Sequence, residues 1–177
     1  NCVCGPFDEI VIPAGLDMID YETELVIVFG RTCKGATRED AWSFLAGVTC
    51  GQDISDRGEQ FRPPLKQFTI AKSYDTFGPT GPYLVTADEL ADPDALELRG
   101  IVSGEVMQEA NTNDLIFDVP ALVVWLSRYI TFQPGDLVWT GTPGGVGEAR
   151  GRFLRAGDVV ETEIEGIGTM RNPVVER

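Results

Sequence analysis

The stretch IDYETELVIVFG, residues 19–30, decides how this chain folds and where its chemistry is placed. Its second half, LVIVFG, is an apolar run of the length and composition typical of a buried strand. Glu22 and Glu24 stand at the entrance to this run, and side chains two residues apart on a strand point to the same face. The sequence therefore predicts two neighbouring carboxylates at the mouth of a core strand.

Two interpretations of this glutamate pair are open. Ionised carboxylates side by side repel, so one would stay protonated unless a cation lies between them. A divalent ion resolves the repulsion, and hard oxygen ligands suit Mg²⁺, Mn²⁺ or Ca²⁺. The alternative is an exposed, frayed strand start at which both side chains face water. The pair alone does not decide between them.

The composition is that of one compact domain with its own core. The chain has 177 residues, 43% of them hydrophobic and 24% charged. We therefore expect residues 1–177 to form a single domain. No apolar run approaches a membrane span and no basic-then-apolar leader is present, so we expect a cytoplasmic protein without a membrane partner.

The charge and the residue usage exclude several function classes. Fourteen Lys and Arg against 28 Asp and Glu give a net charge of −14, which repels phosphate backbones and argues against a nucleic-acid partner. The sequence contains no histidine. Within these residues, that excludes Ser-His-Asp and Cys-His catalysis and HExxH zinc sites.

The remaining pattern favours a β-rich α+β fold, because short strand-like runs alternate with Gly and Pro and only two segments have helical periodicity. A capping box at Thr37–Asp40 predicts one helix, with Ala41, Trp42, Leu45 and Ala46 on a common face. Asp118 is expected to cap a second helix that runs to about Ile130. The predicted strands are 24–30, 47–53, 68–73, 82–86, 96–103, 136–140, 158–165 and 168–175.

Three further segments could carry chemistry. In GVTCGQDISDRGEQ, residues 47–60, Asp53 is either a third carboxylate for the same cation or a turn residue that bonds backbone amides. In TIAKSYDTFGPTGP, residues 69–82, Lys72 either protects an edge strand or reaches a polar site where its ammonium stabilises an oxyanion. In TGTPGGVG, residues 140–147, the backbone amides and Thr142 either hold an anionic oxygen or simply form a tight loop.

Taken together and in order, these segments resemble the C-terminal catalytic domain of the fumarylacetoacetate hydrolase superfamily. The similarity covers almost all of residues 19–175 and is carried by six ordered stretches: DYETELVIVFGR, GQDISDRGEQ, IAKSYDTFGPTGPYLVT, ANTNDLIFDV, PGDLVWTGTPGGVG and AGDVVETEIEGIGTMRNPV. It implies a mixed β-sandwich roll with a few short helices, usually assembled as a homodimer.

The resemblance also implies roles for particular residues. Glu22, Glu24 and Asp53 fall on the ligands of a Mg²⁺ or Mn²⁺ ion. Lys72 falls on the lysine expected to be catalytic and to contact substrate. The other implied substrate contacts are Arg57, Gln60, Gly141 and Thr142.

The activity implied by the resemblance is metal-dependent chemistry on a small anionic 2-oxo or enol acid. The first expectation is hydrolytic C–C cleavage of an acylpyruvate such as fumarylpyruvate. The alternatives are decarboxylation of an oxaloacetate-type acid, isomerisation of a hydroxydienedioate, or a catalytically silent protein that binds a metal or an oxo acid.

One departure from the family pattern bears on this choice. Hydrolases of the family carry a His-Glu pair on an N-terminal lid, where it activates water. Here residues 1–5 pass almost at once into the stretch 6–13, and no histidine is present. We expect the lid to lie outside these residues; without it, hydrolysis has no evident base and decarboxylation is favoured.

Overall fold

The computed structural model describes residues 2–177, in which two five-stranded sheets pack face to face. The first sheet has the order β1-β7-β5-β4-β10, and its strands are β1 (Val3–Cys4), β4 (Thr23–Phe29), β5 (Leu45–Gln52), β7 (Gly78–Val85) and β10 (Leu137–Trp139). The second has the order β2-β12-β11-β8-β9, with β2 (Ile10–Ile12), β8 (Glu97–Val102), β9 (Glu105–Asn111), β11 (Val159–Ile164) and β12 (Gly168–Glu176). A two-stranded ribbon joins β3 (Ile19–Asp20) to β6 (Ser55–Asp56).

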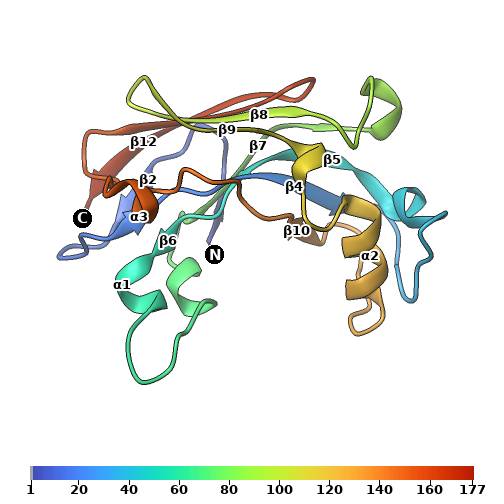
Figure 1. Cartoon of the computed structure of the whole chain (residues 1–177), viewed down its shortest axis with the longest axis horizontal. Coiled ribbons are helices and arrows are strands. Elements are labelled where there is room, and N and C mark those ends of the chain that lie inside the picture. Colours follow the sequence, from blue (N-terminus) through green and yellow to red (C-terminus); the bar gives the residue numbers. More distant parts are fainter. Residues whose placement is uncertain (1) are drawn as a thin grey trace.

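The two sheets form the layers of a mixed sandwich. Figure 1 shows β8, β9 and β12 lying over the layer that contains β4, β5 and β10. Most neighbouring strands are antiparallel, but β1 pairs with β7 and β2 with β12 in parallel. The β-rich α+β class and the mixed β-sandwich roll expected from the sequence are confirmed.

Strand β4 joins the core to the polar end of the sandwich. Leu25, Ile27 and Phe29 alternate along its inner face and are at most 1% exposed. They belong to a core cluster that also draws residues from β5, β8, β11 and β12. This anchored run fixes the direction in which the preceding residues, Glu22 and Glu24, leave the core.

Helix α2 (Val119–Ser127) is the principal helix of the fold. The Asp118 carboxylate accepts a 2.9 Å hydrogen bond from the Ala121 amide, so the predicted cap is confirmed, although the helix ends at Ser127 rather than near Ile130. The other helices are single turns: α1 (Arg57–Gln60), α3 (Gly147–Arg150), η1 (Ala41–Phe44), η2 (Ile70–Lys72), η3 (Ala87–Glu89) and η4 (Thr112–Asp114). Among the helices of residues 2–177, none combines the length and apolarity needed to cross a membrane.

The helix predicted after Thr37 is wrong. The structure has only the 3₁₀ turn η1, after which Leu45 enters β5 and pairs with Phe29 of β4. The Asp40 carboxylate accepts from the Thr37 amide, which makes a local turn instead of a helix cap. Pairing of β5 with the central strand therefore overrides a weak helical pattern.

The strand predicted at 68–73 is also wrong, and strand β9 was not predicted. Lys72 lies in η2, where its amide bonds to the Thr69 carbonyl, so its placement is that of a turn rather than an edge strand. Strand β9 pairs with β8 through a hairpin whose turn residues, Ser103 and Gly104, both have positive φ. Such a Ser-Gly pair between two runs is a recognised hairpin signal.

Candidate active site

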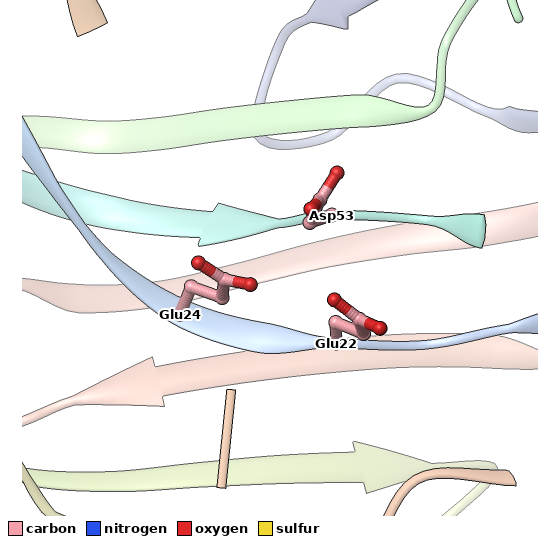
Figure 2. Close-up of side chains that lie close together, drawn as sticks. All are labelled: Glu22, Glu24 and Asp53. Atoms are coloured by element: carbon pink, nitrogen blue, oxygen red, sulfur yellow. The ribbon is translucent and has the colours of Figure 1, made fainter. Parts of the chain in front are cut away.

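Three carboxylates meet where β4 and β5 diverge from the core. Glu24 lies in β4 opposite Gly51 of β5. The antiparallel register therefore places Asp53, which follows β5, next to Glu22, which precedes β4. The Asp53 amide donates a 3.0 Å hydrogen bond to the Glu22 carbonyl. One carboxylate oxygen from each of Glu22, Glu24 and Asp53 lies within 4.8 Å of the others. Figure 2 shows Glu22 and Glu24 rising from one strand on the side where Asp53 lies.

The frayed-strand interpretation of the glutamate pair is wrong, because both side chains are buried. Glu22 is 8% exposed and Glu24 is 3% exposed. Burial, with the nearby Asp53 charge, raises the pKa of Glu24 to about 8, although the Gly141 amide opposes the shift. Burial likewise raises the pKa of Asp53, partly offset by Lys72. A buried carboxylate that resists ionisation is one that gains strongly from a bound cation.

Two cations lie against the cluster. The Lys72 ammonium is 2.8 Å from Glu22 and 2.5 Å from Asp53. The Arg57 guanidinium is 2.7 Å from Glu22 and 2.8 Å from Asp20. Burial would lower the pKa of Lys72, but the two carboxylates outweigh it and hold the pKa above its usual value.

The donor set fits a divalent metal. When ionised, Asp20, Glu22, Glu24 and Asp53 carry four negative charges, and the cations that contact them carry two positive ones. These six side chains therefore sum to a charge of minus two, which one divalent ion would neutralise. Carboxylate oxygens are among the hard ligands that Mg²⁺ and Mn²⁺ prefer.

Gln60 belongs to the same site and is 1% exposed. Its carbonyl oxygen accepts from Arg57 Nη1 at 2.8 Å. The single turn α1 brings the two side chains together, and Asp56 caps that turn through the Glu59 amide at 3.2 Å. The side-chain NH₂ of Gln60 donates to no protein group within residues 2–177.

Gly141 and Thr142 lie beside the carboxylates, but the Gly141 amide and the Thr142 hydroxyl already donate to protein groups. The Gly141 amide donates to Glu24 Oε2 at 2.7 Å. The Thr142 hydroxyl donates to the Thr23 carbonyl at 3.0 Å and accepts from Gln108 Nε2 at 2.8 Å. These contacts hold the 140–148 segment against β4. Direct contact of the two residues with a substrate stays a prediction.

Two residues of the site were missed in the sequence. Asp20 is fully buried and precedes Glu22 and Glu24 by the same two-residue step, so the alternation could have revealed it. Gln108 on β9 is 1% exposed, and its side-chain oxygen accepts from the Thr23 amide at 2.9 Å. It gives no local signal, because its partners lie far away in the sequence.

The chain is similar to known proteins over almost its whole length. The model of the family "Fumarylacetoacetate (FAA) hydrolase C-terminal" matches residues 1–175. The human protein "Oxaloacetate tautomerase FAHD2A, mitochondrial" is 44% identical over 177 residues, covering 99% of this chain and 56% of that protein. The chain thus spans little more than half the length of the curated relatives that it matches.

Solved structures show the same fold at similar identity. A 2-hydroxyhepta-2,4-diene-1,7-dioate isomerase from Mycobacterium marinum superposes with a TM-score of 0.91 at 44% identity, over 99% of this chain and 66% of that one. A maleylpyruvate hydrolase from Sphingobium sp. SYK-6, in complex with manganese(II) and pyruvate, gives a TM-score of 0.88 at 37% identity, over 99% and 61%.

Proposed function

Because the chain belongs to the fumarylacetoacetate hydrolase family, we propose that it is a divalent-metal-dependent enzyme that interconverts the keto and enol forms of small 2-oxo dicarboxylic acids. One observation carries the proposal: three buried carboxylates converge within 4.8 Å, with a lysine and an arginine against them. That arrangement binds a hard cation next to groups that attract an anionic acid.

Glu22, Glu24 and Asp53 would hold the metal, which we propose to be Mg²⁺ or Mn²⁺. A bound metal supplies Lewis acidity that stabilises an enolate formed from a 2-oxo acid. The manganese in the maleylpyruvate hydrolase structure supports this choice of ion.

The protein side chains would bind and orient the acid. An ammonium has three N–H donors and a guanidinium five. Lys72 uses two on the carboxylates, and Arg57 uses three on Asp20, Glu22 and Gln60. The spare donors, with the side-chain NH₂ of Gln60, are available to the substrate's anionic oxygens.

Lys72 would act as a charged donor rather than as a base. Asp53 and Glu22 hold its pKa above the usual range, so the side chain keeps its proton at neutral pH. A fixed ammonium beside a developing enolate oxygen lowers the barrier electrostatically. The proton that leaves the substrate carbon must therefore go to another group.

The relatives favour enol chemistry over the acylpyruvate hydrolysis expected first from the sequence. The proteins at 44% identity are named as an oxaloacetate tautomerase and a dienedioate isomerase, whereas the maleylpyruvate hydrolase is 37% identical. We keep acylpyruvate hydrolysis as the second candidate, because C–C cleavage and decarboxylation of such acids pass through the same kind of enolate.

A substrate panel tests the proposal. The full-length protein is stripped with chelator, reloaded with Mg²⁺ or Mn²⁺, and given oxaloacetate, a hydroxydienedioate and an acylpyruvate. Faster keto–enol interconversion, without cleavage or CO₂ release, supports the proposal. Cleavage of the acylpyruvate supports the hydrolase, and CO₂ release supports the decarboxylase. No metal-dependent response to any acid supports a silent binding protein and contradicts the proposal.

The homodimer implied by the resemblance is also a proposal. Light scattering of the purified full-length protein measures it directly. A mass of one chain at working concentration would contradict it.

A further inference from the structure

Asp20 is a fully buried carboxylate that no expectation from the sequence assigned to the site. It lies in β3 and accepts hydrogen bonds from three backbone amides, those of Tyr21 at 2.8 Å, Gly147 at 2.6 Å and Glu148 at 3.0 Å. Its fourth donor is Arg57 Nε at 2.8 Å. A buried charge is stable only when its lone pairs are satisfied in this way, so the geometry around Asp20 is tightly set.

Asp20 also limits how the Arg57 guanidinium can turn. Nε bonds to Asp20, Nη1 to Gln60 and Nη2 to Glu22, so the planar fork is held at three corners. Arginine binds carboxylates best when that plane is fixed in advance. Of the three partners, Asp20 is the one that also contacts the 140–148 segment.

The 140–148 segment runs antiparallel beside residues 20–25, at the edge of the site. The Thr140 amide bonds to the Leu25 carbonyl at 3.1 Å, and the Tyr21 hydroxyl donates to the Gly145 carbonyl at 3.2 Å. Between these points Gly141 holds Glu24, and beyond them Gly147 and Glu148 hold Asp20. Asp20 therefore joins the end of this segment to the guanidinium of Arg57.

We infer that Asp20 is a positioning residue that presets the Arg57 guanidinium for the carboxylate of a 2-oxo acid. The inference rests on the proposed function, since it needs the acid to bind at this site. Asp20 contributes to substrate affinity through Arg57, and it contributes less to metal affinity because its hydrogen bonds go to Arg57 and to three backbone amides, and to none of the carboxylates proposed to hold the metal.

The test compares two affinities in the full-length protein. Mn²⁺ binding is measured by titration calorimetry, and pyruvate binding is then measured on the Mn²⁺-loaded protein. For Asp20→Asn we expect pyruvate affinity to fall by about 10-fold or more, as for loss of a supporting partner, with Mn²⁺ affinity nearly unchanged. Asp17→Asn, the same substitution at an exposed residue three positions earlier, is the matched control.

A double-mutant cycle separates positioning from a general structural role. If Asp20 acts through Arg57, Asp20→Asn causes no further loss of pyruvate affinity once Arg57→Met is present. Additive losses would overturn the inference, as would a fall in Mn²⁺ affinity equal to the fall in pyruvate affinity.

A second variant covers the case in which Asp20→Asn fails to fold. Asp20→Glu keeps the charge and moves the carboxylate by one methylene, so pyruvate affinity should still fall while Mn²⁺ binding persists. Unchanged pyruvate affinity in this variant would overturn the inference. If the wild-type protein binds neither Mn²⁺ nor pyruvate, the proposed function itself fails, which is a different outcome from failure of the Asp20 coupling.

Discussion

Two segments flank the carboxylate cluster, and they differ in how many hydrogen bonds tie them to the rest of the protein. The fixed wall, residues 140–148, is tied along its length to residues 20–25 by the bonds of Gly141, Thr142 and Gly147. Its counterpart on the other side, the outer wall of residues 61–72, leaves Leu65 81% exposed and Phe68 50% exposed. Figure 1 shows the outer wall projecting from the sandwich beside α1.

The contrast between the two walls shows which half of the site is held in place by the protein before a ligand binds. The fixed wall supports Glu24 and the buried network, so the proposed metal ligands have a rigid mount. The outer wall is attached near its middle by the Gln67 amide, which donates to the Gln60 carbonyl, and at its end by Lys72, which pairs with the carboxylates. Substitutions in the two walls should therefore differ in how they change metal affinity, kcat and stability.

The largest effect is expected from Glu24→Gln, which removes a charged ligand while keeping the side chain's size. Mn²⁺ affinity should fall by at least the roughly 100-fold that loss of an outer-shell partner can cost. Activity should fall with it. Calorimetric titration measures the affinity, and Glu148→Gln, an exposed residue of the fixed wall, is the matched control. Unaltered Mn²⁺ binding would break the assignment of Glu24.

Lys72→Met should separate catalysis from metal binding. Loss of the ammonium should lower kcat by about 100- to 1000-fold, as for removal of an oxyanion-stabilising donor. Mn²⁺ affinity should stay the same or rise, because a competing cation leaves Glu22 and Asp53. Lys66→Met, on the exposed part of the outer wall, is the control. An equal loss of kcat in Lys72→Met and Lys66→Met would contradict a specific catalytic role for Lys72.

Metal affinity should depend on pH through Glu24. Its pKa is raised to about 8 by burial, so a metal must displace a proton below that pH. Affinity should rise with pH, by up to about tenfold per unit, and level off above pH 8. Titrations at several pH values in two buffers measure the affinity and the proton release. A flat profile from pH 6 to pH 8 would contradict the raised pKa.

The raised pKa of Glu24 makes the stability of the metal-free protein fall as the pH rises, whereas metal affinity rises with pH. Because the folded-state pKa lies above the unfolded value, the folded protein holds a proton that the unfolded chain releases. This contribution to stability is full below the ordinary glutamate pKa of 4.5 and is lost as the pH rises through the folded-state pKa of about 8. Urea unfolding with chelator should show this decline, and saturating Mn²⁺ should reduce it.

The smallest effect is expected from Gln108→Met, which tests the support of the fixed wall. The variant leaves the buried Thr23 amide without its acceptor, so the free energy of unfolding should fall by about 1–3 kcal/mol. Urea denaturation measures the loss. Gln133→Met, at an exposed position, should change stability by less than about 0.5 kcal/mol. Equal losses would show that Gln108 has no special role.

Much of the fold was predictable because its strands carry strong local signals. The apolar run 25–29 and the alternation at 159–164 predict β4 and β11, and Asp118 marks the start of α2. The helix expected after Thr37 failed because pairing with β4, a long-range contact, decides the conformation of residues 45–52. Local periodicity carries no information on such pairing.

The site was predictable to the same extent. The glutamate pair has a local spacing signal, but the approach of Asp53 depends on strand register. The residues alone left Asp53 with two open roles, and the family resemblance favoured the metal ligand. Lys72 was expected on a strand and reaches the carboxylates from a turn. Gln108 reaches Thr23 across 85 residues, a contact that no local pattern encodes.

Proton NMR of the methyl hydrogens of pyruvate in D₂O tests most directly whether the carboxylates mount a metal for enol chemistry. We predict that the Mg²⁺-loaded protein speeds the exchange of these hydrogens with deuterium, since enolisation removes one of them. Chelator or Glu24→Gln should abolish the acceleration. Exchange at the uncatalysed rate with Mg²⁺ bound, or acceleration that survives Glu24→Gln, would contradict the claim that these carboxylates mount a metal for enol chemistry.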